Sequence, residues 1–293
     1  MEKLILVAGA TGYIASRLIP PLLEHGYRVR CLVRDPSRLA GRSWAHSVEV
    51  VQADLLRPQT LSALMEGAHA AYYLVHSMSS GRKYAELDLL AARNFVTAAC
   101  YAELEQVIYL GGLADPQGPI SPHMRSRIET GLALREGCVP VTEFRAGVII
   151  GPGSISFEMI RHLSEQLPIL PGPRWLLNLS QPIAIQDVIS YLLATLETVE
   201  SRGETIEIGG TDVMTHGQSM LLYSRQRRLK RYLFTLPYIP IQFMAWVVGL
   251  LTPVPPTIAR PLIGGLQAPS IIRHPKAEEI FPDIHPVDYV TAV

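Results

Sequence analysis

The sequence has few cysteines, no excess of charge of either sign and no apolar run free of proline that is long enough to cross a membrane. The 26 basic residues balance the 26 acidic ones, so no general attraction to nucleic acid is expected. Cys31, Cys100 and Cys138 are widely spaced in apolar surroundings and form no CxxC or metal-binding pattern. We therefore expect three buried thiols in a reducing compartment.

An uncharged stretch at residues 233–259 raises the question of a membrane span. Five prolines interrupt it and leave only residues 241–251 suited to a helix, short of the ~20 that a bilayer requires. We expect no spanning helix. Because the first predicted strand begins directly after Met1-Glu2-Lys3, we also expect no signal peptide and a cytoplasmic protein.

Only 18% of the 293 residues are charged and 48% are hydrophobic, which excludes a disordered chain. The length suits one large α/β domain, or a core domain that carries a smaller lobe.

The segment that organises the chain is a glycine turn near its start. Residues 4–8 are wholly apolar and lead into Gly9 and Gly12, after which apolar residues recur at helical spacing. This order of strand, tight turn and helix is typical of dinucleotide binding, because the first helix amides bind a pyrophosphate. Ala15 replaces the usual third glycine and still allows close packing. The residues expected to bind the cofactor here are Gly9, Thr11, Gly12, Tyr13 and Ile14.

Further strands alternate with helical patterns after this turn. The sequence predicts an α/β fold with a Rossmann-type, doubly wound parallel sheet and right-handed crossovers. We assign residues 1–153 to this dinucleotide-binding core and residues 154–293 to a small C-terminal substrate-binding lobe, with some elements returning to the core. The predicted strands after the first lie at residues 27–33, 47–51, 70–75, 106–110 and 139–144, and another lies in the lobe at residues 205–208.

The residues after the second strand bear on the choice of cofactor. An acidic residue there would bind the ribose 2′-hydroxyl of NAD, about 20 residues after the glycines. Arg34 stands at this place with Arg38 close by, and guanidinium groups suit a 2′-phosphate. Asp35 could instead reach the ribose or cap the next helix. We favour NADP(H) over NAD(H).

Residues that follow the third and fourth strands also lie at the ligand-facing edge of such a sheet. Asp54 and Leu55 are placed near the adenine, although Asp54 could equally cap a turn. Val75 and His76 end the fourth strand and are expected to line the cofactor site.

Together these residues resemble the short-chain dehydrogenase/reductase superfamily, in its extended or atypical branch. The resemblance is nearest to bacterial NAD(P)H-binding proteins grouped with NmrA-like proteins and the complex I accessory subunit. It implies a Rossmann fold and a nicotinamide cofactor more firmly than any substrate. Besides the glycine turn, the motifs lie at residues 32–36, 54–55, 94, 107–110, 144–147, 151–153 and 182–188.

The sequence departs from that superfamily at its catalytic residues, where active members carry a serine and a Tyr-x-x-x-Lys pair. Gly111-Gly112 stands at the serine position, and the helix pair is His123 and Arg127. These two are four residues apart and share a helix face. Arg127 is expected to hold the nicotinamide ribose. The helix N-terminus and the nearby cation favour a neutral His123, which could polarise a carbonyl or relay a proton.

The alternative is that catalysis has been lost and that this pair only lines the cofactor cleft. His76 and Tyr109 are weaker candidates for a proton donor, and we interpret both as wall residues. The chain is thus expected to be an NADP(H)-dependent oxidoreductase acting on a carbonyl or conjugated double bond. A non-catalytic NADP(H)-binding redox sensor or assembly protein is the alternative.

The C-terminal third is rich in large apolar side chains and has one basic cluster. Such side chains suit a small, bulky apolar or aromatic ligand, although packing within a small lobe explains them nearly as well. The basic cluster favours a solvated helix end, and contact with an anionic membrane surface is the alternative. Nucleic acid is not expected, because nothing extends the patch. The two groups are Trp175, Phe234, Tyr238, Phe243, Met244 and Trp246, and Arg225, Arg227, Arg228, Lys230 and Arg231.

Overall fold

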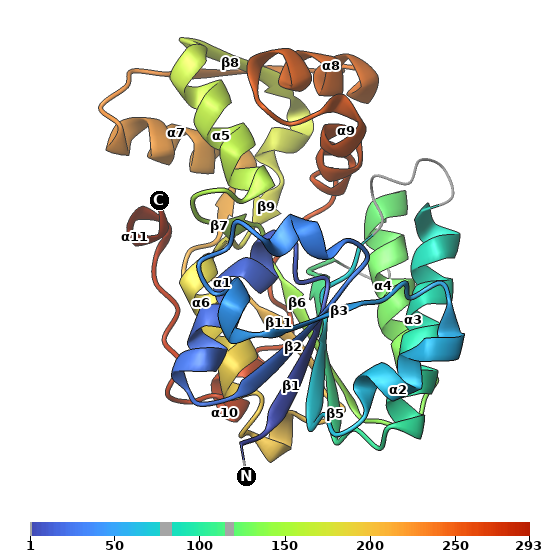
Figure 1. The fold of residues 1–293 in the computed structure, drawn as a ribbon. Helices are drawn as coiled ribbons and strands as arrows, with labels where there is room; N and C mark the ends of the chain where they lie inside the picture. Colours follow the sequence, from blue (N-terminus) through green and yellow to red (C-terminus); the bar gives the residue numbers. More distant parts are fainter. Residues whose placement is uncertain (1, 77–83, 115–119) are drawn as a thin grey trace.

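The computed structural model describes residues 2–76, 84–114 and 120–293 of the chain. Its centre is a seven-stranded sheet in the order β11-β6-β5-β4-β1-β2-β3 (Figure 1). All six strand pairs are parallel. The order reverses between β1 and β4, which places a ligand-binding crevice at the carboxyl ends of the strands. The strands are β1 (Leu4–Ala8), β2 (Arg28–Val33), β3 (Glu49–Gln52), β4 (Ala70–Tyr73), β5 (Gln106–Gly112), β6 (Val141–Ala146) and β11 (Thr205–Ile208).

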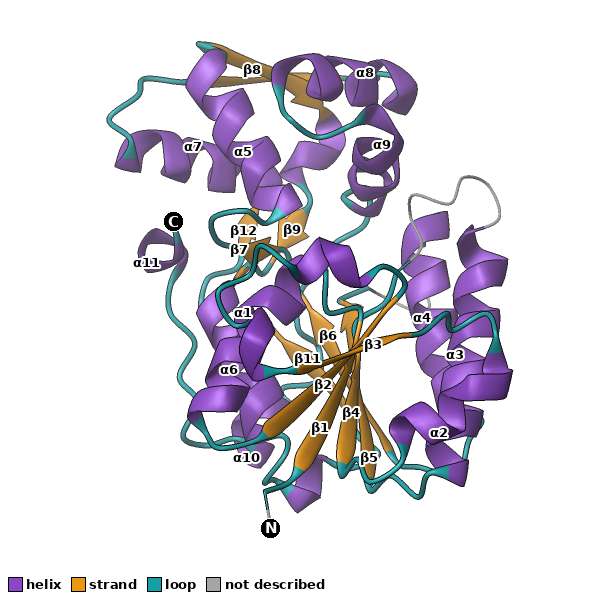
Figure 2. Ribbon diagram, in the orientation of Figure 1, coloured by secondary structure: helices purple, strands orange, loops and turns teal. Residues whose placement is uncertain are grey.

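Helices cover both faces of this sheet (Figure 2). The alternation of side chains along β1 explains the two layers, since successive residues of a strand point to opposite faces. Ile5 and Val7 belong to one hydrophobic core, whereas Leu6 and Ala8 belong to the other. One layer holds α1 (Tyr13–Glu24), α6 (Ile185–Ala194) and α10 (Lys276–Ile280), and the other holds α2 (Leu61–Met65), α3 (Tyr84–Tyr101) and α4 (Pro122–Leu134).

A smaller lobe lies beyond the carboxyl ends of the strands (Figure 1). It has an apolar core of its own, to which α5, α8 and α9 contribute. Its helices are α5 (Ile155–Gln166), α7 (His216–Gln226), α8 (Ile241–Leu251) and α9 (Pro256–Gly265), and α11 (Tyr289–Ala292) packs on α7. Two short strand pairs lie between lobe and core: β7 (Ile149–Ile150) with β10 (Ile183–Ala184), and β9 (Leu179–Ser180) with β12 (Met214–Thr215). A third pair, β8 (Ile169–Pro173) with β13 (Tyr232–Leu236), lies at the outer end of the lobe.

The structure confirms the predicted Rossmann-type α/β fold and adds a strand to its sheet. The strand expected at residues 205–208 is β11, which pairs in parallel with β6 as the seventh strand. It returns to the core together with α6 and α10, although all three follow residue 153. Within the described residues, no helix is both long and apolar enough to cross a membrane.

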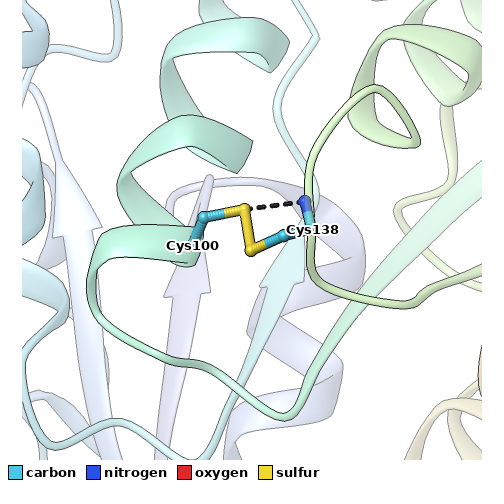
Figure 3. Close-up of a disulfide and its surroundings, with 2 residues drawn as sticks. All are labelled: Cys100 and Cys138. Carbon is cyan, nitrogen blue, oxygen red and sulfur yellow. Dashed lines mark hydrogen bonds between the residues drawn. A yellow bond between two sulfur atoms is a disulfide. The ribbon is translucent and has the colours of Figure 1, made fainter.

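The prediction of three buried thiols is wrong for two of the cysteines. Cys100, near the end of α3, and Cys138, in the segment after α4, form a disulfide with Cα atoms 5.7 Å apart (Figure 3). Cys31 in β2 is a buried free thiol, as expected. The pairing was not visible in the sequence, because 38 residues separate the two cysteines and only the packing of α3 against α4 brings them together. The disulfide removes the argument for a reducing compartment.

Candidate functional site

A cavity of about 540 Å³ lies between the carboxyl ends of the sheet strands and the lobe. The glycine turn forms one wall, the start of α4 a second, and helices α5, α8 and α9 the side opposite the sheet. Of the predicted site residues, those that line it are Gly9, Gly12, Tyr13, Ile14, His76, His123 and Arg127. Its described lining does not include Thr11, Arg34, Arg38, Asp54, Leu55 or Val75.

The glycine turn has the geometry that its residues predict. Gly9 has a φ of +89°, and an added Cβ would lie 2.7 Å from the carbonyl oxygen of Leu74. The Gly12 amide donates to the Gly9 carbonyl at 2.9 Å, and Gly12 is the N-cap of α1. The first amides of α1 therefore open toward the cavity, where a helix N-terminus favours an anion.

The end of β2 is an exposed loop beside this turn. Arg34 and Arg38 are both solvent-exposed. Asp35 accepts hydrogen bonds from the amide and the hydroxyl of Ser37 at 3.0 and 2.7 Å, and so caps a short 3₁₀ helix. Of the two alternatives left open for Asp35, the structure shows the cap. The contact of the two exposed arginines with a 2′-phosphate stays a prediction.

The end of β3 is similarly organised by local hydrogen bonds. The Asp54 carboxylate accepts from the Leu56 amide at 3.1 Å, which is the turn-capping alternative. Asn94 of α3 donates its side-chain amide to the Leu55 carbonyl at 2.8 Å. Asn94 thus fixes the loop that carries Asp54 and Leu55. Their contact with an adenine stays a prediction.

The start of α4 carries the predicted catalytic pair. Ser121 caps the helix by accepting from the Met124 amide, and Pro122 occupies the first turn. A Cβ on Gly112 would lie 2.6 Å from the Met124 methyl group. Met124 therefore fills the space that a side chain would need at this glycine.

Three side chains form a continuous hydrogen-bonded chain into the cavity. His76 Nδ1 lies 2.8 Å from Oδ2 of Asp88, a buried residue of α3. His76 Nε2 lies 3.2 Å from His123 Nδ1. The Ser126 hydroxyl donates to the same Asp88 oxygen at 3.4 Å. His76, expected as a wall residue, lines the cavity but also links Asp88 to His123.

Arg127 is held at the same wall by the ends of two strands. Its guanidinium lies 4.8 Å from the centre of the Tyr109 ring, a cation–π contact. It also donates to the carbonyls of Val75, at 3.5 Å, and Leu110. Tyr109 donates its hydroxyl to the Arg127 carbonyl at 2.8 Å. Tyr109 is fully buried behind Arg127 and is not among the described residues that line the cavity, so it does not form the wall that we expected.

Both histidines of this hydrogen-bonded chain, His76 and His123, favour the neutral form. Burial, then the neighbouring His76 and Arg127, lower the pKa of His123 to about 3. Burial also lowers the pKa of His76, although the Asp88 carboxylate opposes this shift. The expected neutral His123 is thus supported, but desolvation is its main cause rather than the cation alone.

The lobe side of the cavity differs from its predicted composition. Trp175 and Met244 line it. The other four large residues do not fill the interior of the lobe, because their side chains are exposed: Phe234, Tyr238, Phe243 and Trp246. They form an outer surface.

Sequence reasoning missed three polar residues at or behind the cavity wall. Ser180 and His216 line it, and neither the Ser180 hydroxyl nor His216 Nε2 has a hydrogen-bond partner within the described chain. Burial lowers the pKa of His216 to about 4. Asp88 lies behind His76. An available signal was the position of Asp88 on the buried face of α3, three and seven residues before Ala91 and Phe95.

Comparison with known proteins gives relatives that agree with this fold. The photosystem II assembly factor Ycf39 of Trieres chinensis is 26% identical over 216 residues, covering 70% of this chain and 63% of that protein. Cinnamoyl-CoA reductase 1 of Oryza sativa subsp. japonica is 26% identical over 152 residues, covering 49% of this chain and 42% of that protein. The chain thus spans less than two-thirds of the length of these relatives.

Solved structures show the same fold at low sequence identity. The NADPH-dependent quinone oxidoreductase QOR2 of Escherichia coli aligns with a TM-score of 0.77 at 17% identity, over 98% of this chain and 97% of that one. A nucleoside-diphosphate-sugar epimerase of Staphylococcus aureus gives 0.76 at 14%, over 99% and 98%. The NmrA-like family model matches residues 1–150, just over half of the 293 residues. This matched segment contains the glycine turn and the start of α4. Sequence match and fold therefore agree, and the chain belongs to the NmrA-like family.

Proposed function

We propose that this protein is an NADP(H)-dependent oxidoreductase that reduces a carbonyl or a conjugated double bond of a bulky apolar substrate. The observation that carries the proposal is the cavity, which brings the glycine turn, His123 and Arg127 to one largely apolar space. Similar proteins named as an NADPH-dependent quinone oxidoreductase and a cinnamoyl-CoA reductase support the reaction class.

The described residues fit a nicotinamide dinucleotide. Gly9 and Gly12 form a turn in which an added side chain at Gly9 would collide with backbone, so that the α1 amides stay open to a pyrophosphate. When bound, the dinucleotide supplies the hydride. The residues proposed to hold it are Gly9, Thr11, Gly12, Tyr13 and Ile14 at the pyrophosphate, Arg34 and Arg38 at the 2′-phosphate, Asp54 and Leu55 at the adenine, and Val75, His76 and Arg127 at the ribose and nicotinamide.

The chemistry of this chain is proton transfer at His123. His123 lines the cavity and contacts His76 through Nδ1, so a proton held on its Nε2 can pass to the substrate atom that gains negative charge. Arg127 orients the cofactor ribose from the same helix face. The apolar walls of α5, α8 and α9 exclude water from the reacting atoms.

A non-catalytic NADP(H)-binding sensor or assembly protein is the second candidate. The similarity to the photosystem II assembly factor Ycf39 favours it. So does Gly111-Gly112, which stands where active members of the resembled superfamily carry their serine.

We also propose that the lobe contacts an anionic membrane, from which an apolar substrate would be taken. Phe243, Trp246 and Leu250 share the outer face of α8 and are exposed. Met244 and Val248 of the same helix line the cavity. The exposed cations that precede β13 complement a negative surface: Arg225, Arg227, Arg228 and Lys230.

The first test is calorimetric titration with NADPH and NADH, followed by the decay of absorbance at 340 nm with quinones, enones and aldehydes. Tight NADPH binding with turnover supports the reductase, and binding without any turnover favours the sensor. Binding of neither dinucleotide would contradict both. His123→Gln should slow turnover about 10²-fold, as expected for loss of a general acid, whereas exposed His46→Gln should not.

The same titration tests the choice of NADP(H). Arg34→Ala should weaken NADPH binding about tenfold and leave NADH binding unchanged, because only NADPH carries the 2′-phosphate. Arg28→Ala, at the opposite end of β2, is the control and should change neither. Equal losses for both dinucleotides in Arg34→Ala would remove the role assigned to Arg34.

A further inference from the structure

The hydrogen-bonded chain of Asp88, His76 and His123 fixes where its protons lie. A carboxylate only accepts hydrogen bonds, so Asp88 requires the proton of His76 on Nδ1, 2.8 Å away. His76 Nε2 is then an acceptor, and His123 must donate to it from Nδ1 across 3.2 Å. His123 is left with Nε2 bare. Both rings are thus neutral Nδ1–H tautomers, oriented from the buried end of the chain.

The burial of Asp88 and the position of the two histidines at the cavity determine where an added proton resides. Asp88 is 2% exposed and does not line the cavity, whereas both histidines do. A positive charge on His76 would lie directly against the Asp88 carboxylate. A positive charge on His123 would face neutral His76 and the Arg127 guanidinium from one helical turn away. The three hydrogen-bonded side chains therefore hold an extra proton at His76 in preference to His123.

We propose that Asp88, His76 and His123 form a proton relay in which His76 stores the proton beside Asp88 and His123 passes it to the substrate. The proposal rests on the proposed function and adds two positioning residues to it. Asp88 and His76 act through His123, which alone would touch the reacting atoms.

The step balances for reduction of a carbonyl by a reduced nicotinamide dinucleotide. The charged state has protons on both nitrogens of His76 and on Nε2 of His123. As the carbonyl carbon gains hydride and its π bond breaks, the oxygen takes the Nε2 proton of His123. His76 passes its Nε2 proton to Nδ1 of His123. The product has new C–H and O–H bonds, the dinucleotide is oxidised, and both rings are left in the resting Nδ1–H tautomers, ready for reprotonation by solvent.

The relay explains how a histidine with a low pKa can donate. His123 never carries the charge by itself, because it gains one proton as it loses another. The groups that face His76 within the described residues are Asp88 and Tyr84 from α3, and His123 and Arg127 from α4. Burial and Arg127 lower the pKa of His76, so the stored proton is lost as pH rises through a value below 6.5. Reduction should therefore slow as the pH rises through that range.

The direct test is long-range ¹H–¹⁵N correlation spectroscopy of protein labelled with ¹⁵N-histidine, without cofactor or substrate. The expected result is Nδ1–H tautomers at both His76 and His123, with His76 taking up a proton before His123 as pH falls. Asp88→Asn should lower the pKa of His76 by about one unit or more. Exposed Glu86→Gln, two residues away on α3, is the matched control and should leave it unchanged. His76→Gln and His123→Gln assign the signals.

Steady-state kinetics gives the second readout. Asp88→Asn should lower kcat for NADPH oxidation about 10²-fold, with KM for NADPH within about twofold. If Asp88→Asn fails to fold, His76→Gln takes its place and should lower kcat by a similar factor. An Nε2–H tautomer at His76, protonation of His123 before His76, or an unchanged His76 titration in Asp88→Asn would overturn the relay. Nδ1–H tautomers with no NADPH oxidation would support the chain and overturn the proposed function.

Discussion

At the scale of single residues, Gly9 joins the stability of the fold to the proposed cofactor site. Its φ of +89° disfavours any residue with a Cβ, and that atom would lie 2.7 Å from the Leu74 carbonyl oxygen. Gly9→Ala is therefore expected to lower the free energy of unfolding by about 1–3 kcal/mol and to weaken NADPH binding. Urea unfolding and calorimetric titration measure the two effects.

Gly41 provides the matched control for this substitution. An added Cβ there meets no atom within 4 Å, and its φ is not in the left-handed region. Gly41→Ala should leave the free energy of unfolding unchanged or slightly higher, because alanine restricts the unfolded chain. Equal stabilities of the two variants would contradict the steric argument.

The residues of the cavity wall also show which parts of the site could be predicted from the sequence. Gly9, Gly12, His123 and Arg127 were found because each belongs to a local pattern: a strand, turn and helix, or a four-residue spacing. The hydrogen bond between Asp88 and His76 could not be predicted from the sequence, because twelve residues separate the two and the bond depends on how α3 packs beside β4. His216 and Ser180 belong to no local pattern. Their role at the wall follows only from the pairing of β9 with β12.

At the scale of elements, prolines marked the ends of one helix in the sequence. The residues expected to be helical at 241–251 are those of α8, since Pro240 and Pro253 flank them. β11 was expected as a strand, but its place beside β6 was not. That pairing joins Thr205 with Glu143, which are far apart in sequence, and side-chain periodicity carries no information on partners.

The disulfide between α3 and the segment after α4 makes a prediction at this scale. A cross-link over 38 residues restricts the unfolded chain, so reduction should lower the free energy of unfolding by about 2–4 kcal/mol. Urea unfolding with and without dithiothreitol, followed by circular dichroism, measures the difference. Cys138→Ser should show the lower stability under both conditions. A wild-type protein unaffected by dithiothreitol would contradict the prediction.

At the scale of the whole molecule, the outer end of the lobe carries exposed aromatic side chains. Tyr238 is 78% exposed and Trp246 is 58% exposed. β13 and α8 lie along this outer edge, next to the segment that ends α7 (Figure 1). Part of the basic cluster there has a structural role. Arg231 donates to the carbonyls of Ser164 and Glu165 at the end of α5, so it is not available to lipid headgroups.

The membrane contact proposed for this surface can be measured by cosedimentation with phosphatidylcholine vesicles that contain or lack phosphatidylserine. Binding should require the anionic lipid and weaken with salt, and the Trp246 fluorescence should shift to the blue. Burial of one such side chain contributes about 1.5–3 kcal/mol, so the two together contribute about 3–6 kcal/mol. The double variant Phe243→Ser/Trp246→Ser should therefore bind at least about a hundredfold more weakly.

Tyr101→Ser is the control for that double variant. Tyr101 is an aromatic residue even more exposed than Phe243 and Trp246, but it lies at the end of α3 on the core. It should bind vesicles as the unmodified protein does. Loss of binding in both variants would point to general destabilisation instead of a membrane face. A different outcome is that the unmodified protein does not bind anionic vesicles and forms a dimer by light scattering, whereas Phe243→Ser/Trp246→Ser is a monomer. In that case the outer face of α8 joins two copies of the chain. An apolar substrate would then have to reach the cavity from solution, because α8, whose inner face lines that cavity, would be covered by protein.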